Sequence, residues 1–276
     1  MAGILFLVAT PIGNLADISA RALETLRTVS FIVCEDTRHS RVLLSHYGIS
    51  KETVSLPGFA ERQRAARILE KIGAGEDCAL ITDAGSPGIS DPGEALVSGA
   101  VELGFRVSPI PGPSAAIAAL TASGLPTARF HFLGFLPRKR AEREKILLEV
   151  EPLQATLVLY ESPQRLLDLL RDLHSALGPR RACVARELTK VHEELVRGTL
   201  PELVARHEGS EVLGEVVVVV EGRTGAAPWS EEEIRSALAE GLGRGEPLKA
   251  VSRDLAQRSG WSARDLYRIG LSLPRR

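Results

Sequence analysis

The stretch 78–93 constrains the fold of this chain most, because a strand, a turn-rich loop and the start of a helix follow one another in it. The apolar run that begins at Cys78 is too short for a helix and ends at once in glycine and proline, which predicts a buried parallel strand leading into a loop. Asp91 is then expected to cap a helix that has Pro92 at its first position. The stretch therefore predicts a strand–loop–helix unit of a parallel α/β sheet.

Loops of this kind are candidate ligand sites, because ligands of open α/β sheets bind beyond the carboxyl ends of the strands, where glycine lets the backbone approach closely. The alternative is that glycine and proline serve only to turn the chain. Similar loops follow the apolar run 4–9 and, at 111–114, open a helix of small residues. A further strand ends in the polar cluster 35–39, which either contacts a ligand or is a solvated loop whose Asp36 or Thr37 caps the next helix.

The length of 276 residues and the hydrophobic content of 44% suit about two domains with ample core. A break at 124–126 separates them, so we expect two consecutive α/β domains with mainly parallel sheets, at 1–122 and 123–224. The remaining segment, 228–276, is expected to form a small C-terminal helical module. The fold class is therefore α/β with a helical accessory module.

Charge is distributed unevenly along the chain. The net charge of -1 argues against attraction of the whole protein to nucleic acid. Segment 138–145 carries five positive and two negative residues and is either a solvated helix start or a phosphate contact. Ser230 and Glu233 are expected to start a helix as a capping box. The segment that follows this helix, 244–276, carries eight positive and three negative residues. It binds nucleic acid, docks a partner or is simply solvated.

The three cysteines, Cys34, Cys78 and Cys183, lie far apart in apolar runs and are expected to be buried and reduced, as in a cytosolic protein. No cysteine or histidine spacing indicates a metal site. The apolar start, 4–9, has no preceding lysine or arginine, which favours a first strand over a signal peptide. No apolar run is long enough to span a bilayer.

Seven motifs follow one another along the chain at 8–15, 34–38, 86–93, 111–115, 134–137, 160–163 and 186–190, reading VATPIGNL, CEDTR, SPGISDPG, PGPSA, GFLP, YESP and RELTK. In this order they resemble the motifs of the ribosomal RNA small subunit methyltransferase I family, within the tetrapyrrole methylase superfamily. The resemblance spans essentially the whole chain. Seven motifs in register are far more specific than any single glycine loop.

The resemblance implies an S-adenosylmethionine-dependent enzyme that holds its cofactor in the cleft between two α/β domains. It also implies a cytoplasmic homodimer, without membrane association, that acts on 16S rRNA or the small ribosomal subunit and methylates the 2′-hydroxyl of a cytidine in the decoding region. One departure is Ser86, where many relatives have threonine; serine keeps the hydroxyl. The methyl donor has no phosphates, and the sequence contains no phosphate-binding loop motif.

Motif matching also transfers the residues expected to bind the cofactor, several of them through backbone atoms. Such a site needs backbone donors and acceptors and a pocket that aligns sulfur, methyl group and acceptor oxygen. The residues are Pro11, Gly85, Ser86, Pro87, Ser114, Ala115, Leu136, Tyr160, Glu161, Leu188 and Gly214.

The candidates for catalysis are four charged residues at strand ends, Asp36, Arg38, Glu187 and Lys190. A 2′-hydroxyl is a weak acid, so a base or a nearby cation would help its oxygen attack. A buried lysine with a lowered pKa could serve as the base, and a charged lysine could stabilise the developing oxyanion. Equally, Glu187 and Lys190 could simply pair with each other, and Asp36 and Arg38 could form a structural ion pair.

Two other functions compete with rRNA methylation. The same fold could methylate a small tetrapyrrole, although the basic segments 138–145 and 244–276 have little use there. A non-catalytic RNA-binding ribosome factor could also retain the fold. A nicotinamide-dependent oxidoreductase is disfavoured, because no Gly-x-Gly-x-x-Gly follows the first strand.

Overall fold

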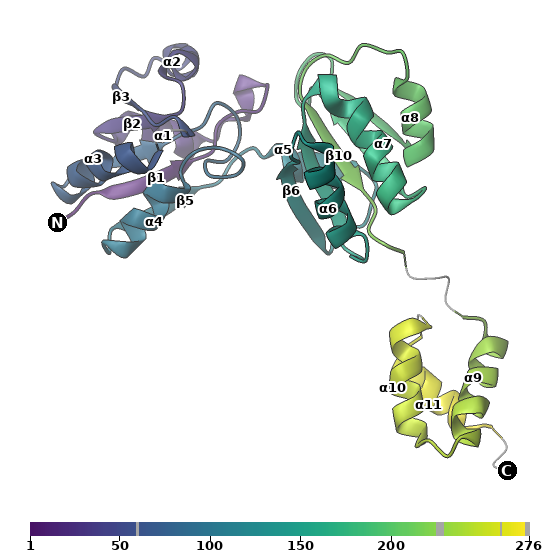
Figure 1. Cartoon of the computed structure of the whole chain (residues 1–276). Helices are drawn as coiled ribbons and strands as arrows, with labels where there is room; N and C mark the ends of the chain where they lie inside the picture. Colours follow the sequence, from purple (N-terminus) through teal and green to yellow (C-terminus); the bar gives the residue numbers. More distant parts are fainter. Residues whose placement is uncertain (59–60, 225–228, 260, 274–276) are drawn as a thin grey trace.

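The computed structural model describes residues 1–58, 61–224, 229–259 and 261–273. They form two five-stranded sheets with flanking helices, followed by a group of three helices (Figure 1). This confirms the expected α/β class with two consecutive sheets and a helical module. Cys34, Cys78 and Cys183 are buried and free, as expected. Within the described ranges, every helix is too short or too polar to span a membrane.

All strands of the first sheet run parallel, in the order β3-β2-β4-β1-β5. β3 was not predicted, because its sequence, ETVS, lacks an apolar run and its residues are only partly buried. In a parallel sheet the carboxyl ends of neighbouring strands meet at one edge, so the loops after β1, β2 and β4 lie together. The strands are β1 (Ile4–Val8), β2 (Phe31–Cys34), β3 (Glu52–Ser55), β4 (Cys78–Leu80) and β5 (Arg106–Ile110).

Helices cover both faces of this sheet, each pair over its own apolar cluster. A short 3-10 turn, η1 (Leu15–Asp17), precedes the first pair. One face carries α1 (Ala20–Thr28) and α2 (Thr37–His46), and the other carries α3 (Glu61–Gly73) and α4 (Glu94–Glu102).

The start of α4 differs from the prediction. The helix begins after Gly93, so Asp91 is not its cap. Instead, the Glu61 carboxylate on α3 accepts hydrogen bonds from the backbone N–H groups of Gly93 and Ala95, at 3.0 and 2.7 Å. The prediction was wrong because a residue distant in the sequence supplies the acceptor that a local cap normally provides.

The second sheet is mixed, with the order β6-β7-β10-β8-β9. Only β6 and β7 pair in parallel; the other three pairs are antiparallel. The expectation of mainly parallel strands therefore holds for the first sheet alone. The valine run of β10 is buried on both faces. A central strand is buried in this way in a parallel or in an antiparallel sheet, so the composition of β10 did not distinguish the two. The strands are β6 (Phe130–Phe135), β7 (Thr156–Glu161), β8 (Arg181–Arg186), β9 (Glu194–Thr199) and β10 (Val216–Val220).

Helices also lie on both faces of the second sheet. One face packs against α6 (Arg140–Val150), α7 (Leu166–Leu177) and α8 (Leu200–His207), with the turn η3 (Pro163–Arg165) leading into α7. The other face packs against α5 (Ala115–Ala122), which follows the last strand of the first sheet. Small side chains on α5, among them Ala116 and Ala119, allow this close contact, so α5 joins the two halves.

The C-terminal helices are α9 (Glu231–Gly243), α10 (Leu248–Arg258) and α11 (Ala263–Leu271), which Figure 1 shows grouped together. They share an apolar core of their own, built around Ile234, Leu255 and Leu266. The predicted capping box of Ser230 and Glu233 is confirmed. The expected boundary between the second α/β domain and this module, at 224–228, includes residues 225–228, which lie outside the described residues.

Candidate active site

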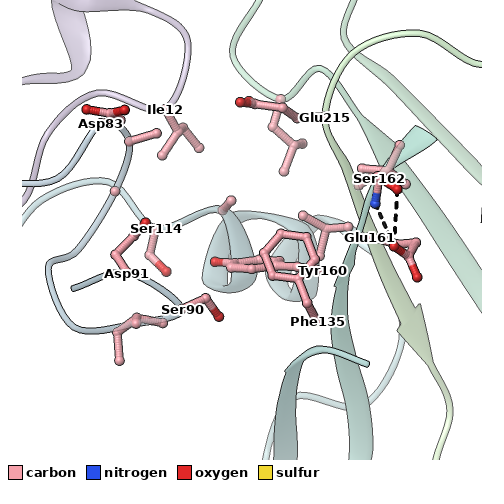
Figure 2. A pocket seen from close by; sticks show the side chains of 18 of the residues that line it. Ile12, Asp83, Ser90, Asp91, Ser114, Phe135, Tyr160, Glu161, Ser162 and Glu215 are labelled. Carbon is pink, nitrogen blue, oxygen red and sulfur yellow. Dashed lines mark hydrogen bonds between the residues drawn. The ribbon is translucent and has the colours of Figure 1, made fainter. Parts of the chain in front are cut away.

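Two adjoining cavities lie where the carboxyl edge of the first sheet faces the second sheet. The larger has a volume of 450 Å³, a size that suits a small-molecule ligand. Figure 2 shows Asp83, Asp91 and Ser114 from the first half on one side of it, and Tyr160 and Glu161 from the second half on the other. Loops far apart in the sequence therefore build one cleft.

The cofactor residues expected from the motifs mostly converge on this larger cavity. Pro11 lines the smaller cavity instead. Pro87 and Leu136 line neither; Leu136 packs in the core of the second half, and its carbonyl accepts a hydrogen bond from Arg165 at 3.1 Å. The predicted cofactor residues that line the larger cavity are Gly85, Ser86, Ser114, Ala115, Tyr160, Glu161, Leu188 and Gly214.

Backbone hydrogen bonds hold the first and the central glycine loops together. Thr10 N–H donates to the Gly85 carbonyl at 2.8 Å, and Gly85 N–H donates to the Thr10 carbonyl at 3.1 Å. The Thr10 hydroxyl also donates to the Thr82 carbonyl at 3.0 Å. Gly85 has φ of 84°, a conformation that favours glycine. The two motifs thus form a single rigid wall.

Tyr160 forms the aromatic side of the larger cavity. Its ring lies 5.0 Å from that of Phe132 and 5.5 Å from that of Phe135, between ring centres. Its hydroxyl accepts a hydrogen bond at 3.2 Å from the N–H of Ala116, at the start of α5. Burial raises the pKa of Tyr160, so the phenol stays neutral. One amide of the α5 N-terminus is therefore already satisfied by the protein.

Glu161 is buried, with 3% of its surface exposed. Its Oε1 accepts a hydrogen bond from Ser162 N–H at 2.8 Å, and its Oε2 lies 3.2 Å from an Arg165 guanidinium nitrogen. Ser162 precedes the turn η3, and its side chain makes no capping hydrogen bond there. The buried, paired carboxylate stabilises the turn that ends β7.

The loop 187–190 contains two non-glycine residues with positive φ, Glu187 at 50° and Thr189 at 66°. Such conformations cost energy and persist only where the surroundings impose them. A Cβ on Gly13 would lie 2.5 Å from Lys190 Cγ, and a Cβ on Gly214 would overlap the Glu187 carboxyl group. Two glycines therefore let the backbone close around this loop from both sides.

Lys190 is held by two carboxylates. Its Nζ donates to Glu187 Oε1 at 2.8 Å and to Glu215 Oε2 at 3.1 Å, while Glu187 Oε1 also accepts from Glu215 N–H at 2.9 Å. Burial lowers the pKa of Lys190, but these two carboxylates outweigh it and the net shift is upward. The hydrogen bond from Lys190 lowers the pKa of Glu187. Lys190 is thus a cation, which fits oxyanion stabilisation rather than the role of a base.

Asp36 and Arg38 form the structural pair that the sequence left open. The Asp36 carboxylate accepts hydrogen bonds from the Arg38 backbone N–H and guanidinium, both at 2.8 Å, and caps α2. These hydrogen bonds lower the pKa of Asp36 to about 2. Neither residue lines the two cavities, nor does Glu187; of the four catalytic candidates, Lys190 alone does.

Glu215 lines the larger cavity from the second half, and three carboxylates from the first half that sequence reasoning had not selected as site residues either, Glu35, Asp83 and Asp91, also line it. Burial and their mutual repulsion raise the pKa of Glu35 and Asp91. Their signal in the sequence was position, since each lies in a loop that follows a buried strand. Within the described ranges, no group of three or more His, Cys, Asp or Glu side chains is arranged to hold a metal ion.

The basic segment 138–145 is largely neutralised by the protein itself. Arg143 is buried and pairs with Asp172, whose Oδ2 accepts from its Nε at 2.6 Å. Lys139 and Arg140 pair with glutamates one helical turn away. Arg138 and Lys145 are exposed. Most of this segment therefore serves the helix start.

The architecture and the cleft define a class of two-sheet α/β proteins. Among solved structures, the chain resembles uroporphyrin-III C-methyltransferase from Thermus thermophilus, in complex with S-adenosylhomocysteine, with a TM-score of 0.56 and 17% identity over 79% of this chain and 96% of that one. The chain belongs to the tetrapyrrole (corrin/porphyrin) methylase family, which matches residues 5–204. It is a methyltransferase.

Curated relatives are similar over almost their whole length. The chain is 44% identical to the ribosomal RNA small subunit methyltransferase I of Synechocystis sp., over 98% of both chains. It is 43% identical to the protein of the same name from Haemophilus influenzae, over 99% of this chain and 98% of that one. The similarity thus includes the C-terminal helical module.

Proposed function

We propose that this chain transfers a methyl group from S-adenosylmethionine to the 2′-hydroxyl of a cytidine in the decoding region of 16S rRNA. The observation that carries the proposal is the sequence identity of 42–44% over nearly the full length to relatives named ribosomal RNA small subunit methyltransferase I. The convergence of the motif residues on one cleft supports it.

The larger cavity fits S-adenosylmethionine. Its volume of 450 Å³ suits a cofactor of that size, and the carboxylates of Asp83 and Asp91 complement a ligand that carries a sulfonium and an ammonium charge. Ser114 and Ala115, at the N-terminus of α5, would present backbone N–H groups to its polar ends. When bound there, S-adenosylmethionine supplies a methyl group on a positively charged sulfur.

The residues of this chain then bind and orient the acceptor. Lys190, charged and held at the cleft, would donate a hydrogen bond to the acceptor oxygen and stabilise the negative charge that this oxygen gains as its proton passes to solvent and it attacks the methyl group. Glu187 would act as a positioning residue for Lys190. Asp36 and Arg38, among the candidates from the sequence, would contribute by fixing the start of α2.

The test is methyl transfer from labelled S-adenosylmethionine to small ribosomal subunits that lack native modification, followed by nuclease mapping of the labelled nucleoside. Label on a cytidine ribose is expected. Label on porphyrinoids but not on RNA would favour the small-tetrapyrrole function. RNA binding without binding of the methyl donor would favour a non-catalytic ribosome factor.

The proposal also includes the cellular setting that the resemblance implies. An enzyme of the small ribosomal subunit acts in the cytoplasm, and relatives' motifs imply a homodimer. Light scattering on the purified protein is expected to give twice the mass of the 29.7 kDa chain. A monomer would remove the homodimer from the proposal without affecting the reaction.

A further inference from the structure

The smaller cavity is a separate feature of the cleft, with a volume of 230 Å³. It shares Ile12, Asp83, Ala84 and Glu215 with the wall of the larger cavity. It therefore opens directly beside the proposed cofactor position. Its volume is below the range of about 300–1,000 Å³ of pockets that enclose a drug-sized ligand, so it suits a smaller occupant.

Three elements build most of this cavity, and the central glycine loop and Glu215 complete it. The first glycine loop supplies one side, and the loop that carries Lys190 supplies another. The third is α2, whose His39, Val42 and Leu43 lie at i, i+3 and i+4 and therefore on one helix face. Val42 is 68% exposed, so it lies on the solvent side of this cavity.

The wall of the smaller cavity has an apolar part and a charged part. α2 supplies the imidazole of His39 and apolar side chains, and the charged groups are the Lys190 ammonium and the carboxylates of Asp83 and Glu215. An ammonium has three donors. Among the described residues, Glu187 and Glu215 are the hydrogen-bond partners of Lys190 Nζ, so one donor is left for a ligand oxygen.

We propose that the smaller cavity receives a single unstacked nucleotide of the RNA acceptor. Its ribose lies toward Lys190 and the shared wall, and its base lies against His39 and Val42. Single-stranded RNA is commonly recognised this way, by unstacked bases that contact flat or apolar side chains and by hydrogen bonds to the 2′-hydroxyl. The inference rests on the proposed function, because it places the acceptor next to the methyl donor.

The test fills the cavity mouth without touching the larger cavity. Val42→Trp adds bulk at an exposed position on α2, and Val101→Trp is the matched control, 62% exposed on α4 and outside both cavities. Three quantities are measured: the dissociation constant for S-adenosylhomocysteine by calorimetry, the KM for undermethylated small subunits, and the affinity for a single-stranded RNA oligonucleotide by filter binding.

For Val42→Trp we expect at least a tenfold rise in KM and weaker binding of the oligonucleotide, with S-adenosylhomocysteine binding within twofold of the unsubstituted protein. The control should change none of the three. Unchanged KM and RNA affinity in Val42→Trp, or an equal loss of S-adenosylhomocysteine binding, would overturn the subsite.

Failure of the proposed function gives a different pattern. In that case the unsubstituted protein itself methylates no subunit or rRNA. Oligonucleotide binding that Val42→Trp weakens would still support the nucleotide subsite, whereas equal binding by both proteins would refute it.

Discussion

Replacing Gly214 by alanine should disturb the site through one defined contact. Gly214 has φ of 90°, and a Cβ there would overlap the Glu187 carboxyl group, which holds Lys190. Gly209 offers a matched control, because its φ is 71° and a Cβ there would meet nothing within 4 Å. Both substitutions strain the backbone, but only Gly214→Ala displaces the carboxylate.

The two costs can be separated. A residue with a Cβ in the left-handed region costs about 1–2 kcal/mol, and both variants should lose this. Gly214→Ala should also lose the hydrogen bonds of Glu187 to Lys190 and to Glu215 N–H. Hydrogen bonds to charged groups contribute about 1.5–3 kcal/mol, and the 30% exposure of the Lys190 side chain reduces this to about 1 kcal/mol.

Thermal unfolding and initial rates test this reasoning together. We expect the Tm of Gly214→Ala to fall about 2–4 °C below that of Gly209→Ala, given the usual relation between free energy and Tm for chains of this size. Methyl transfer at saturating donor should fall at least tenfold in Gly214→Ala only, because a displacement of about 1 Å at a reacting centre can cost two orders of magnitude. Equal Tm values and equal rates for the two variants would refute the role assigned to this contact.

Three further changes test other parts of the structure. Glu187→Gln should lower the Tm near neutral pH. Folding lowers the pKa of Glu187 from 4.5 and raises that of Lys190 from 10.5, so the stabilisation by this pair should be lost as the pH falls through the folded-state pKa of Glu187 or rises through that of Lys190. At both limits the difference in Tm from the unsubstituted protein should vanish. Arg143→Met leaves the buried carboxylate of Asp172, among the described residues, with only a longer contact to Arg140, and should cost about 3 kcal/mol in calorimetry; an unchanged melting curve would contradict a structural role. In the helical module, three exposed basic residues form no ion pair with the described residues: Lys249, Arg253 and Arg264. Replacing all three by glutamate should weaken binding to small subunits and reduce the salt dependence of that binding, while binding of S-adenosylhomocysteine stays the same.

Much of the architecture could be predicted from local patterns. Apolar runs that end in glycine and proline located most of the strands, and the capping box of Ser230 and Glu233 located the start of α9. The elements missed are β3, β9 and α8. The two strands are partly exposed and depend on pairing with distant segments, which local sequence does not reveal. The short helix α8 did carry a local signal, a capping box of Thr199 and Glu202.

The candidate site was also predictable in part from local sequence patterns. Motif positions located most residues of the larger cavity, because parallel strand ends must meet at one edge. The protonation state of Lys190 was not predictable, since it depends on Glu215, which lies 25 positions away. The role of Asp91 was not predictable for the same reason: it lines the larger cavity, and Glu61 on another helix accepts the hydrogen bond at the start of α4 that Asp91 was expected to accept.

The packing of α5 explains why two sheets of different type maintain one cleft. The helix leaves the first sheet at the edge where the loops gather, and then buries Ala116, Ala119 and Leu120 against the second sheet. At its N-terminus, Ser114 and Ala115 line the larger cavity, and the next amide binds Tyr160. The packing of α5 against the second sheet is therefore linked to the wall that its N-terminus adds to the larger cavity. Stability of the interface and the shape of the cofactor cavity thus depend on the same short helix, whose small side chains satisfy both requirements.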